Sequence, residues 1–205
     1  MIKFALPKGR LAEKSAELLA KCGVDTSVLA EDTRKLFLER ADRWYGFFLV
    51  KPADVPAYVE AGVADLGIVG KDTLIEEGRD LYEMLDLKMG ECRLCIAGYP
   101  ERKDVLTNPH LRVATKYVNT ARRADREEIE IIPLHGSIEL APVTGLADVI
   151  FDVVQTGSTL KANGLVVLEE VFTGITARLV ANKVCLKTKA AELLPLIARL
   201  REAVS

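Results

Sequence analysis

The sequence has few histidines, few aromatic residues and no long hydrophobic run. His110 and His135 are the two histidines among 205 residues, which leaves little material for an imidazole-based zinc site or a Ser-His-Asp arrangement. No apolar run approaches the roughly 20 residues that cross a bilayer. The short apolar start that ends at Pro7 predicts a first strand rather than a signal peptide. A net charge of −2 provides no overall attraction for nucleic acid or an anionic membrane.

The four cysteines raise the question of a metal or redox site. Cys92 and Cys95 have C-x-x-C spacing, but a zinc site would need further ligands. The apolar residues 94–97 predict a strand, which sends these two side chains to opposite faces. We therefore expect reduced, structural cysteines and a cytoplasmic protein.

The remaining composition is that of a folded domain, with 49% hydrophobic and 28% charged residues. Apolar strand patterns alternate with amphipathic helix patterns, which predicts an α/β protein. Strands are expected at 2–6, 64–70, 93–98, 111–115, 130–134, 149–152 and 177–181. A hairpin is expected from 32–38 and 44–50, and helices at 11–21, 55–61 (capped by Asp54) and 188–203. From Gly90 the pattern indicates a second α/β unit.

Residues 148–160 have the layout of a phosphate-binding turn. An apolar strand ends in Asp152, a small polar loop follows, and a helix is expected to open at Leu160. Backbone N–H groups at such a junction favour an anion, and Gly157 allows a close backbone approach. The loop lacks the Gly-Lys-Ser/Thr ending of a P-loop and is not a G-x-G-x-x-G turn. It is typical of a sugar monophosphate site, although an ordinary helix start capped by Thr159 has the same pattern.

Basic residues follow several of the predicted strands. Lys8 and Arg10 flank Gly9 after the first strand, and Lys51 and Lys71 follow two others. Ligands of open α/β sheets bind outside the carboxyl ends of strands, so these residues and Arg34 are candidate phosphate ligands. Each of them taken alone is more typical of a solvated surface side chain.

A longer signature extends upstream of the phosphate-type loop, with Glu139, Pro142, Gly145, Asp148 and Asp152 at fixed spacing. With Thr156, Gly157, Thr159 and the N-terminal segment 6–11, it resembles the catalytic subunit of ATP phosphoribosyltransferase, the first enzyme of histidine biosynthesis. The resemblance covers nearly the whole chain. It implies transfer of phosphoribosyl from phosphoribosyl pyrophosphate to N1 of ATP, with release of pyrophosphate.

The resemblance also implies an architecture. We expect two α/β lobes similar to a type II periplasmic binding protein, with the active site in the inter-lobe cleft. Lobe I would comprise 1–88 plus 174–205 and lobe II 89–173. Between Asn119 and Glu130 the chain is shorter than its relatives, through either a clipped helix or an omitted segment. The end at Ser205 is typical of the short form without a C-terminal regulatory domain.

The site residues expected on this basis form three groups. For phosphoribosyl pyrophosphate they are Glu139, Asp152, Thr156, Gly157, Ser158, Thr159 and Leu160. For ATP they are Lys8, Gly9, Arg10, Gly70, Lys71 and Asp72. Arg34 and Lys51 are expected to be catalytic, as cations over the reacting diphosphate. Relatives commonly carry arginine where Lys51 stands, and lysine keeps the charge but lacks the planar fork.

The chain is expected to provide no metal-ligand set of its own, so Mg²⁺ would be carried mainly by substrate phosphates. The implied partner is a histidyl-tRNA-synthetase-like regulatory subunit in a heteromultimer. Two other functions compete. A non-catalytic two-lobed sensor fits the same fold. A base-using phosphoribosyltransferase fits poorly, because it would carry an acidic pair just before the loop, whereas Asp148 and Asp152 are separated by three apolar residues.

Overall fold

The computed structural model describes residues 1–31, 33–39, 44–123 and 129–205. The chain divides into two compact units and passes between them twice. Unit 1 comprises Met1–Gly90 and Thr176–Ser205, and unit 2 comprises Glu91–Ile175. The lobe boundaries expected from the resemblance, 1–88 with 174–205 and 89–173, stay a prediction.

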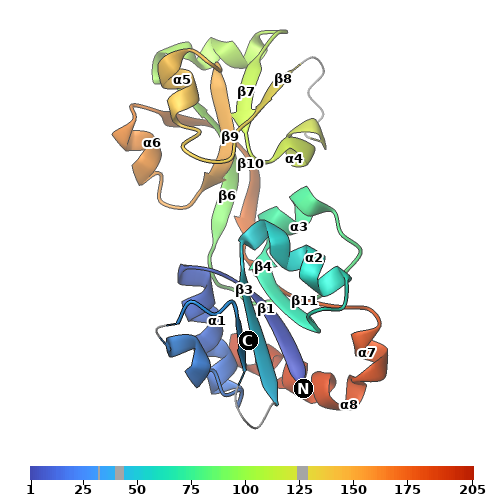
Figure 1. The fold of residues 1–205 in the computed structure, drawn as a ribbon. Helices are drawn as coiled ribbons and strands as arrows, with labels where there is room; N and C mark the ends of the chain where they lie inside the picture. The colour runs from blue at the N-terminus through green and yellow to red at the C-terminus, as the bar shows by residue number, and fades with distance from the viewer. Residues whose placement is uncertain (32, 40–43, 124–128) are drawn as a thin grey trace. The chain divides into compact units, whose positions relative to one another are not determined.

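Unit 1 contains a six-stranded sheet in the order β2-β3-β1-β4-β11-β5 (Figure 1). The three parallel strands are β3 (Tyr45–Val50), β1 (Ile2–Pro7) and β4 (Leu66–Gly70). The three strands antiparallel to their neighbours are β2 (Phe37–Glu39), β11 (Ala177–Ala181) and β5 (Tyr82–Asp86). Strands β1 and β4 are largely buried apolar runs, as expected for strands covered on both faces.

Helices cover both faces of this sheet (Figure 1). Helices α1 (Arg10–Lys21) and α8 (Ala190–Val204) pack over a core that contains Phe4, Phe47 and Leu193. On the other face, α2 (Val55–Glu60) packs over Val69 and Val180. The remaining helical segments of the unit are η1 (Ser27–Ala30), η2 (Pro52–Asp54), α3 (Lys71–Glu77) and α7 (Cys185–Thr188).

Unit 2 contains a five-stranded sheet in the order β10-β6-β9-β7-β8. Its parallel strands are β9 (Val149–Val154), β7 (Arg112–Thr115) and β8 (Glu130–Pro133). Strands β6 (Cys92–Gly98) and β10 (Val166–Ile175) pair antiparallel on the other side of β9. One face packs against η3 (Pro100–Thr107) and α4 (Val118–Arg123), and the other against α5 (Leu140–Thr144) and α6 (Ser158–Ala162).

The predicted single strands are confirmed with shifts of one or two residues at their ends. The predicted hairpin is the antiparallel pair β2–β3, but its first strand is Phe37–Glu39 rather than 32–38, because residues 33–36 are not in a strand. Asp32 and most of the expected hairpin loop, at 40–43, lie outside the described residues, as do 124–128 of the segment expected to be short. The prediction missed two strands: β5, whose residues Tyr82–Asp86 follow no clear apolar alternation, and β10, which is mostly half-buried or exposed and pairs with β6 through several register shifts.

The helix boundaries differ from the prediction at three points. The helix after the phosphate-type loop begins at Ser158 rather than Leu160, with Gly157 at its N-cap. Asp54 makes no side-chain cap bond, because the 3₁₀ turn η2 already leads into α2. The closing helix α8 begins at Ala190 rather than at 188 and contains Pro195 in its interior, and the short helix α7 precedes it.

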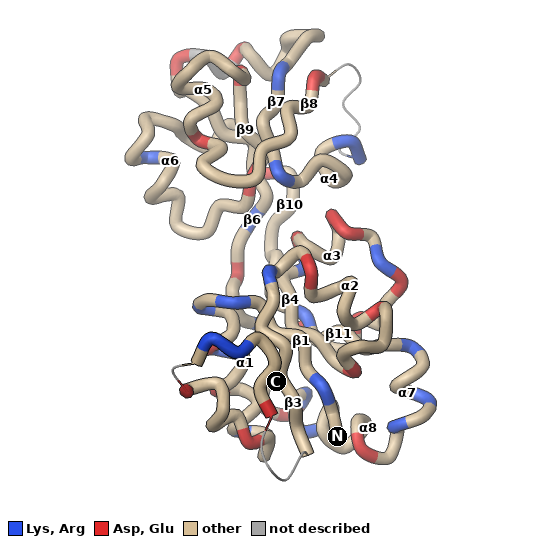
Figure 2. Tube along the Cα trace, in the orientation of Figure 1, with Lys and Arg blue, Asp and Glu red and all other residues tan. Residues whose placement is uncertain are grey.

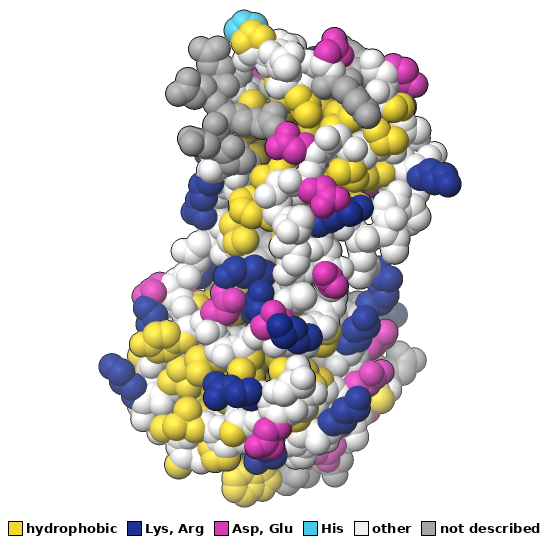
Figure 3. Space-filling model, turned by 180° about the vertical axis from the view of Figure 1, so that it is seen from behind, with side chains coloured by type: hydrophobic (Ala, Val, Ile, Leu, Met, Phe, Trp, Pro, Cys, Tyr) yellow, Lys and Arg dark blue, Asp and Glu magenta, His cyan; other side chains and the backbone are white. Residues whose placement is uncertain are grey.

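The surface charges and the cysteine positions agree with the expectations from the sequence. On the face drawn in Figure 3, side chains of both signs are interspersed. None of the four cysteines, all of which are among the described residues, forms a disulfide. Cys92 packs against one core of unit 2 and Cys95 lies in the other, which confirms that they occupy opposite faces of β6. Among the described residues, no helix is both long and apolar enough to span a membrane.

Candidate functional site

Three lysines follow the carboxyl ends of the three parallel strands of unit 1. Lys51 follows β3, Lys8 follows β1 and Lys71 follows β4. Because parallel strands end at the same edge of a sheet, these lysines share one edge. Strand register supports this, since Pro7 pairs with Val50 and the Lys8 N–H donates to the Val50 carbonyl at 3.0 Å.

Arg34 approaches the same edge from the antiparallel strand β2. Phe37, the first residue of β2, pairs with Phe48 near the end of β3. The Leu49 N–H donates to the Leu36 carbonyl at 3.0 Å, which extends the pairing toward Arg34. The Arg34 side chain is exposed, like those of Lys8, Arg10 and Lys51. The basic positions of unit 1 can be followed along the trace in Figure 2.

Gly9 gives the turn after β1 its shape. Its φ of 91° lies in the region that side-chain-bearing residues rarely adopt. The Gly9 carbonyl accepts the Ala12 N–H at 2.8 Å, so α1 begins directly after this turn. A Cβ at Gly9 would meet no atom within 4 Å. The glycine is therefore required for backbone conformation, and the space above it is open.

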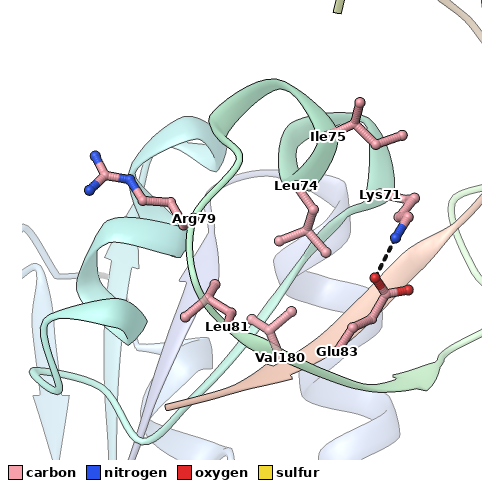
Figure 4. Close-up of a pocket in the computed structure, with 7 residues that line it drawn as sticks. All are labelled: Lys71, Leu74, Ile75, Arg79, Leu81, Glu83 and Val180. Atoms are coloured by element: carbon pink, nitrogen blue, oxygen red, sulfur yellow. Dashed lines mark hydrogen bonds and ion pairs between the residues drawn. The ribbon is translucent and has the colours of Figure 1, made fainter. Parts of the chain in front are cut away.

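Lys71, expected at the ATP site, already has an acidic partner. Its ammonium forms an ion pair with Glu83 of β5 across a pocket of about 210 Å³ (Figure 4). The pocket is also lined by Leu74, Ile75, Arg79, Leu81 and Val180. Glu83 also lies 3.3 Å from Arg178 Nε. An anionic ligand at Lys71 would therefore compete with a carboxylate.

Gly70 and Asp72 complete this strand-to-helix junction. Gly70 caps α3, and the Asp72 carboxylate lies against it, so that a Cβ at Gly70 would approach Asp72 Oδ1 to 2.1 Å. The Lys71 N–H donates to the Thr176 carbonyl at 3.0 Å, so this junction is hydrogen-bonded to the residue that precedes β11.

In unit 2 the phosphate-type loop follows β9. Gly157, with φ 73°, takes the left-handed conformation at the start of α6. The hydroxyls of Thr156 and Ser158 lie 3.0 Å apart, and the Lys161 N–H donates to the Gly157 carbonyl at 3.0 Å. The side chains of Thr156, Ser158 and Thr159 are exposed. The loop therefore presents hydroxyls and a glycine to solvent at the carboxyl edge of the sheet.

Leu160 contributes to the site differently from the hydroxyl residues. Its side chain is 6% exposed and packs in the core with Cys95 and Ile150. Its side chain therefore anchors the loop, and its backbone N–H is the group available to an anion.

Asp152 is a half-buried carboxylate just before the loop. Its side chain is 20% exposed, and Oδ1 is buried without a hydrogen bond from the described residues. The Lys116 ammonium lies 3.5 Å from that oxygen. Burial raises the pKa of Asp152, the Lys116 charge lowers it, and the like charge of Glu139 raises it. Of the predicted site residues, Glu139 thus acts on Asp152 through its charge.

The two edges offer binding and electrostatic groups rather than a nucleophile. Burial raises the pKa of the Cys22, Cys95 and Cys185 thiols, the last to about 11, which makes them poor nucleophiles at neutral pH. Within the described ranges, no three His, Cys, Asp or Glu side chains converge as a metal-binding group. Such an arrangement suits the binding of phosphates and sugar hydroxyls.

Two charged residues at these edges were missed by the sequence prediction. Lys116 carried no motif, and its proximity to Asp152 depends on the pairing of β7 with β9. Glu83 lies on β5, one of the two strands that were not predicted. A search for charged residues directly after each predicted strand would have found Lys116, which follows the expected strand 111–115.

Comparisons with known proteins agree on one family. The family model described as "HisG: ATP phosphoribosyltransferase" matches residues 51–202. An ATP phosphoribosyltransferase of Caldanaerobacter subterraneus subsp. tengcongensis is 51% identical, and the match covers 100% of this chain and 98% of that protein. A chain in the solved ATP phosphoribosyl transferase (HisG:HisZ) complex from Thermotoga maritima is 38% identical, with a TM-score of 0.86 over 100% of this chain and 98% of that one. The periplasmic aliphatic sulphonate binding protein SsuA of Escherichia coli is 19% identical, with a TM-score of 0.60 over 98% of this chain and 72% of that one, a likeness of fold alone.

Proposed function

The chain belongs to the ATP phosphoribosyltransferase family, and from that premise we propose how its residues divide the work of the reaction. The enzyme transfers a phosphoribosyl group to ATP in the first step of histidine biosynthesis. Membership of this enzyme family excludes the non-catalytic sensor that the fold alone allowed. The periplasmic binding protein shares the fold at only 19% identity, so its likeness carries no argument for a sensor function.

Phosphoribosyl pyrophosphate binds at the carboxyl edge of unit 2 in this proposal. Gly157 and the Thr156, Ser158 and Thr159 hydroxyls would hold the 5′-phosphate. Asp152 would accept hydrogen bonds from ribose hydroxyls, with Glu139 beside it. The observation that carries the proposal is Oδ1 of Asp152, a buried acceptor next to a hydroxyl-rich loop that makes no hydrogen bond among the described residues and has the Lys116 ammonium 3.5 Å away as an ion-pair partner. A buried oxygen that makes no hydrogen bond is costly, so a ligand hydroxyl would stabilise it.

The basic edge of unit 1 would bind the phosphates of ATP and the departing diphosphate. Lys8, Gly9 and Arg10 surround the turn after β1, and Gly70, Lys71 and Asp72 form the junction after β4. Arg34 and Lys51 would act as the catalytic cations. The supporting observation is that strand order and register bring these separate segments to one sheet edge.

Catalysis would come from positioning and electrostatics. In the transfer, the C1–O bond to the diphosphate breaks and a C1–N1 bond to adenine forms. Orienting two reactants can supply roughly 7–11 kcal/mol of barrier reduction. Fixed cations at the departing diphosphate stabilise the negative charge that develops there. We assign that second role to Arg34 and Lys51.

Mg²⁺ would enter with the substrate. The described residues offer no carboxylate cage of three groups, and Mg²⁺ in phosphate sites commonly keeps waters and substrate oxygens as ligands. Bound there, it would neutralise diphosphate charge. The residues of the chain would then bind and orient the metal-loaded substrate.

The assembly is inferred from a similar chain, and the cellular location from the cysteines. The similar chain from Thermotoga maritima comes from a HisG:HisZ complex. We propose that this chain likewise works in a heteromultimer with a histidyl-tRNA-synthetase-like regulatory subunit. Cysteines without disulfides among the described residues are compatible with the reducing cytoplasm where we expect it to act.

The test is a steady-state assay of the purified chain with ATP, phosphoribosyl pyrophosphate, Mg²⁺ and pyrophosphatase, with and without the regulatory subunit. Phosphoribosyl-ATP is followed by absorbance. The Asp152→Asn variant should raise KM for phosphoribosyl pyrophosphate and leave KM for ATP nearly unchanged. Lys187→Met, an exposed change on α7, is the control. Equal effects of Asp152→Asn on both KM values would contradict the assignment of Asp152 to the ribose.

A further inference from the structure

Lys116 and Asp152 lie beside one another at the carboxyl edge of the second sheet. Strands β7 and β9 are parallel neighbours, and Thr115 pairs with Phe151. The next residue on each strand is Lys116 on one side and Asp152 on the other. Their proximity therefore comes from strand register, although 36 positions separate Thr115 from Phe151.

The backbone on both sides of Lys116 is fixed by one buried hydroxyl. Thr115 Oγ1 donates to the Phe151 carbonyl at 2.6 Å and accepts the Tyr117 N–H at 2.8 Å. Thr115 is fully buried and Tyr117 is 5% exposed. The Lys116 ammonium lies 4.9 Å from the centre of the Tyr117 ring, within cation–π range. The lysine thus extends from a rigid base, with its ammonium between an aromatic ring and Asp152.

The surroundings of Asp152 make a nearby cation important. Glu139 adds a second negative charge from the segment before α5. Cys95 faces Asp152 across the β6–β9 pair, and burial raises the pKa of its thiol, so it stays neutral. Burial also raises the pKa of Asp152 itself, and Lys116 is the charge that opposes this shift. An ionised carboxylate is purely an acceptor and offers both oxygens to hydroxyl donors, whereas the protonated form turns one oxygen into a donor.

We propose that Lys116 is a positioning residue for the phosphoribosyl pyrophosphate site, whose ammonium keeps the Asp152 carboxylate ionised and in place to receive the ribose hydroxyls. The proposal rests on the ribose-binding role of Asp152 given above. Lys116 acts through Asp152 and not on the reacting atoms.

The test compares Lys116→Met, which removes the charge and keeps most of the length, with Lys116→Arg, which restores the charge. The profile of kcat/KM for phosphoribosyl pyrophosphate against pH is measured for each variant in the active assembly. The acidic limb is the part of this profile in which kcat/KM falls as the pH decreases. In Lys116→Met the acidic limb should move to higher pH, because Asp152 then loses the cation that favours its ionised form. We expect a loss on the order of tenfold at the acidic end and little loss at the alkaline end. Lys116→Arg should largely restore the wild-type profile.

Two results would overturn this role. An equal loss at every pH would mean that Lys116 binds a substrate phosphate directly. An unchanged profile would mean that the ion pair is only a surface contact. Thermal unfolding of each variant is measured alongside, since a purely structural role would lower the Tm without moving the acidic limb.

The Asp152→Asn background separates this inference from the proposed function. There Lys116→Met should produce no further movement of the acidic limb, because no carboxylate remains to titrate. If Asp152→Asn alone leaves KM for phosphoribosyl pyrophosphate unchanged, the ribose assignment fails. If Asp152→Asn raises that KM but Lys116→Met leaves the limb in place, the ribose assignment stands and the positioning role of Lys116 fails.

Discussion

Lys189 Nζ lies 2.8 and 2.9 Å from the two carboxylate oxygens of Asp65. This pair joins the segment before α8 to the segment before β4, and Asp65 also accepts the Lys3 N–H at 2.8 Å. The Asp65 side chain is 3% exposed and that of Lys189 is 33% exposed. The C-terminal part of unit 1 is thus held to its N-terminal strands by a nearly buried carboxylate.

Lys189→Met should therefore destabilise the protein. It leaves the Asp65 charge with the Lys3 N–H and the Cys185 side chain but without its cation, and breaking a buried pair is costly. Because Lys189 is partly solvated, we expect about 2 kcal/mol rather than the full buried-pair value. The measurement is urea unfolding followed by far-UV circular dichroism. Lys187→Met, two positions away and exposed, should change the free energy of unfolding by less than about 0.5 kcal/mol.

Acid should weaken unit 1 through Asp86. Burial raises the pKa of this carboxyl, but the Thr176 hydroxyl, the Lys88 N–H and Arg178 outweigh burial and hold it well below its ordinary value. A depressed pKa contributes stability above the unfolded value of about 3.9 and loses it as pH falls through the folded value. Asp86→Asn should lower stability at neutral pH and flatten the decline below about pH 4.

The measurement for Asp86 is the free energy of urea unfolding across an acidic pH series. Asp80→Asn, at a carboxylate whose side chain is 77% exposed, serves as the control and should leave the slope nearly unchanged. A slope as steep in Asp86→Asn as in the wild type would show that other carboxylates dominate the acid response.

Gly157→Val should weaken phosphoribosyl pyrophosphate binding more than it weakens the fold. The left-handed φ of 73° costs a residue with a side chain about 1–2 kcal/mol, and the new side chain would also occupy the space above the loop. We expect KM for phosphoribosyl pyrophosphate to rise by at least roughly tenfold. Thr159→Ala should raise it less, since one hydroxyl is removed without backbone strain.

Gly164 provides a matched control for backbone strain. Its φ is 71° and it follows the other end of α6. Gly164→Ala should therefore cost similar stability and leave KM nearly unchanged. Equal KM values for Gly157→Val, Thr159→Ala and the wild type would remove the loop from the site.

Glu83→Gln tests whether Lys71 binds ATP. The substitution removes the carboxylate that pairs with the Lys71 ammonium, so a phosphate would no longer compete for it. A partly exposed ion pair is worth up to about 1 kcal/mol, which predicts a decrease in KM for ATP of about threefold. In a Lys71→Met background the same change should have no such effect. A decrease that persists there would assign the effect to Arg178, the other cation beside Glu83.

Much of the fold could be predicted from the sequence because its signals are local. The buried runs of β1 and β4 and the hydrophobic period of α1 are properties of a few consecutive residues. The segment Tyr82–Asp86 was missed because β5 has exposed and half-buried positions that follow no clean alternation. Its place in the sheet comes from pairing with β11, almost a hundred residues further along the chain.

The site divides in the same way. The sequence by itself determined the family, the hydroxyl-rich loop with its glycine, and the basic residues after the strands. The tertiary structure decided which of these residues meet a partner: Lys71 with Glu83, and Lys116 with Asp152. The physical reason is that strand order and register depend on long-range pairing and core packing, whereas hydrophobic period and turn chemistry are properties of consecutive residues.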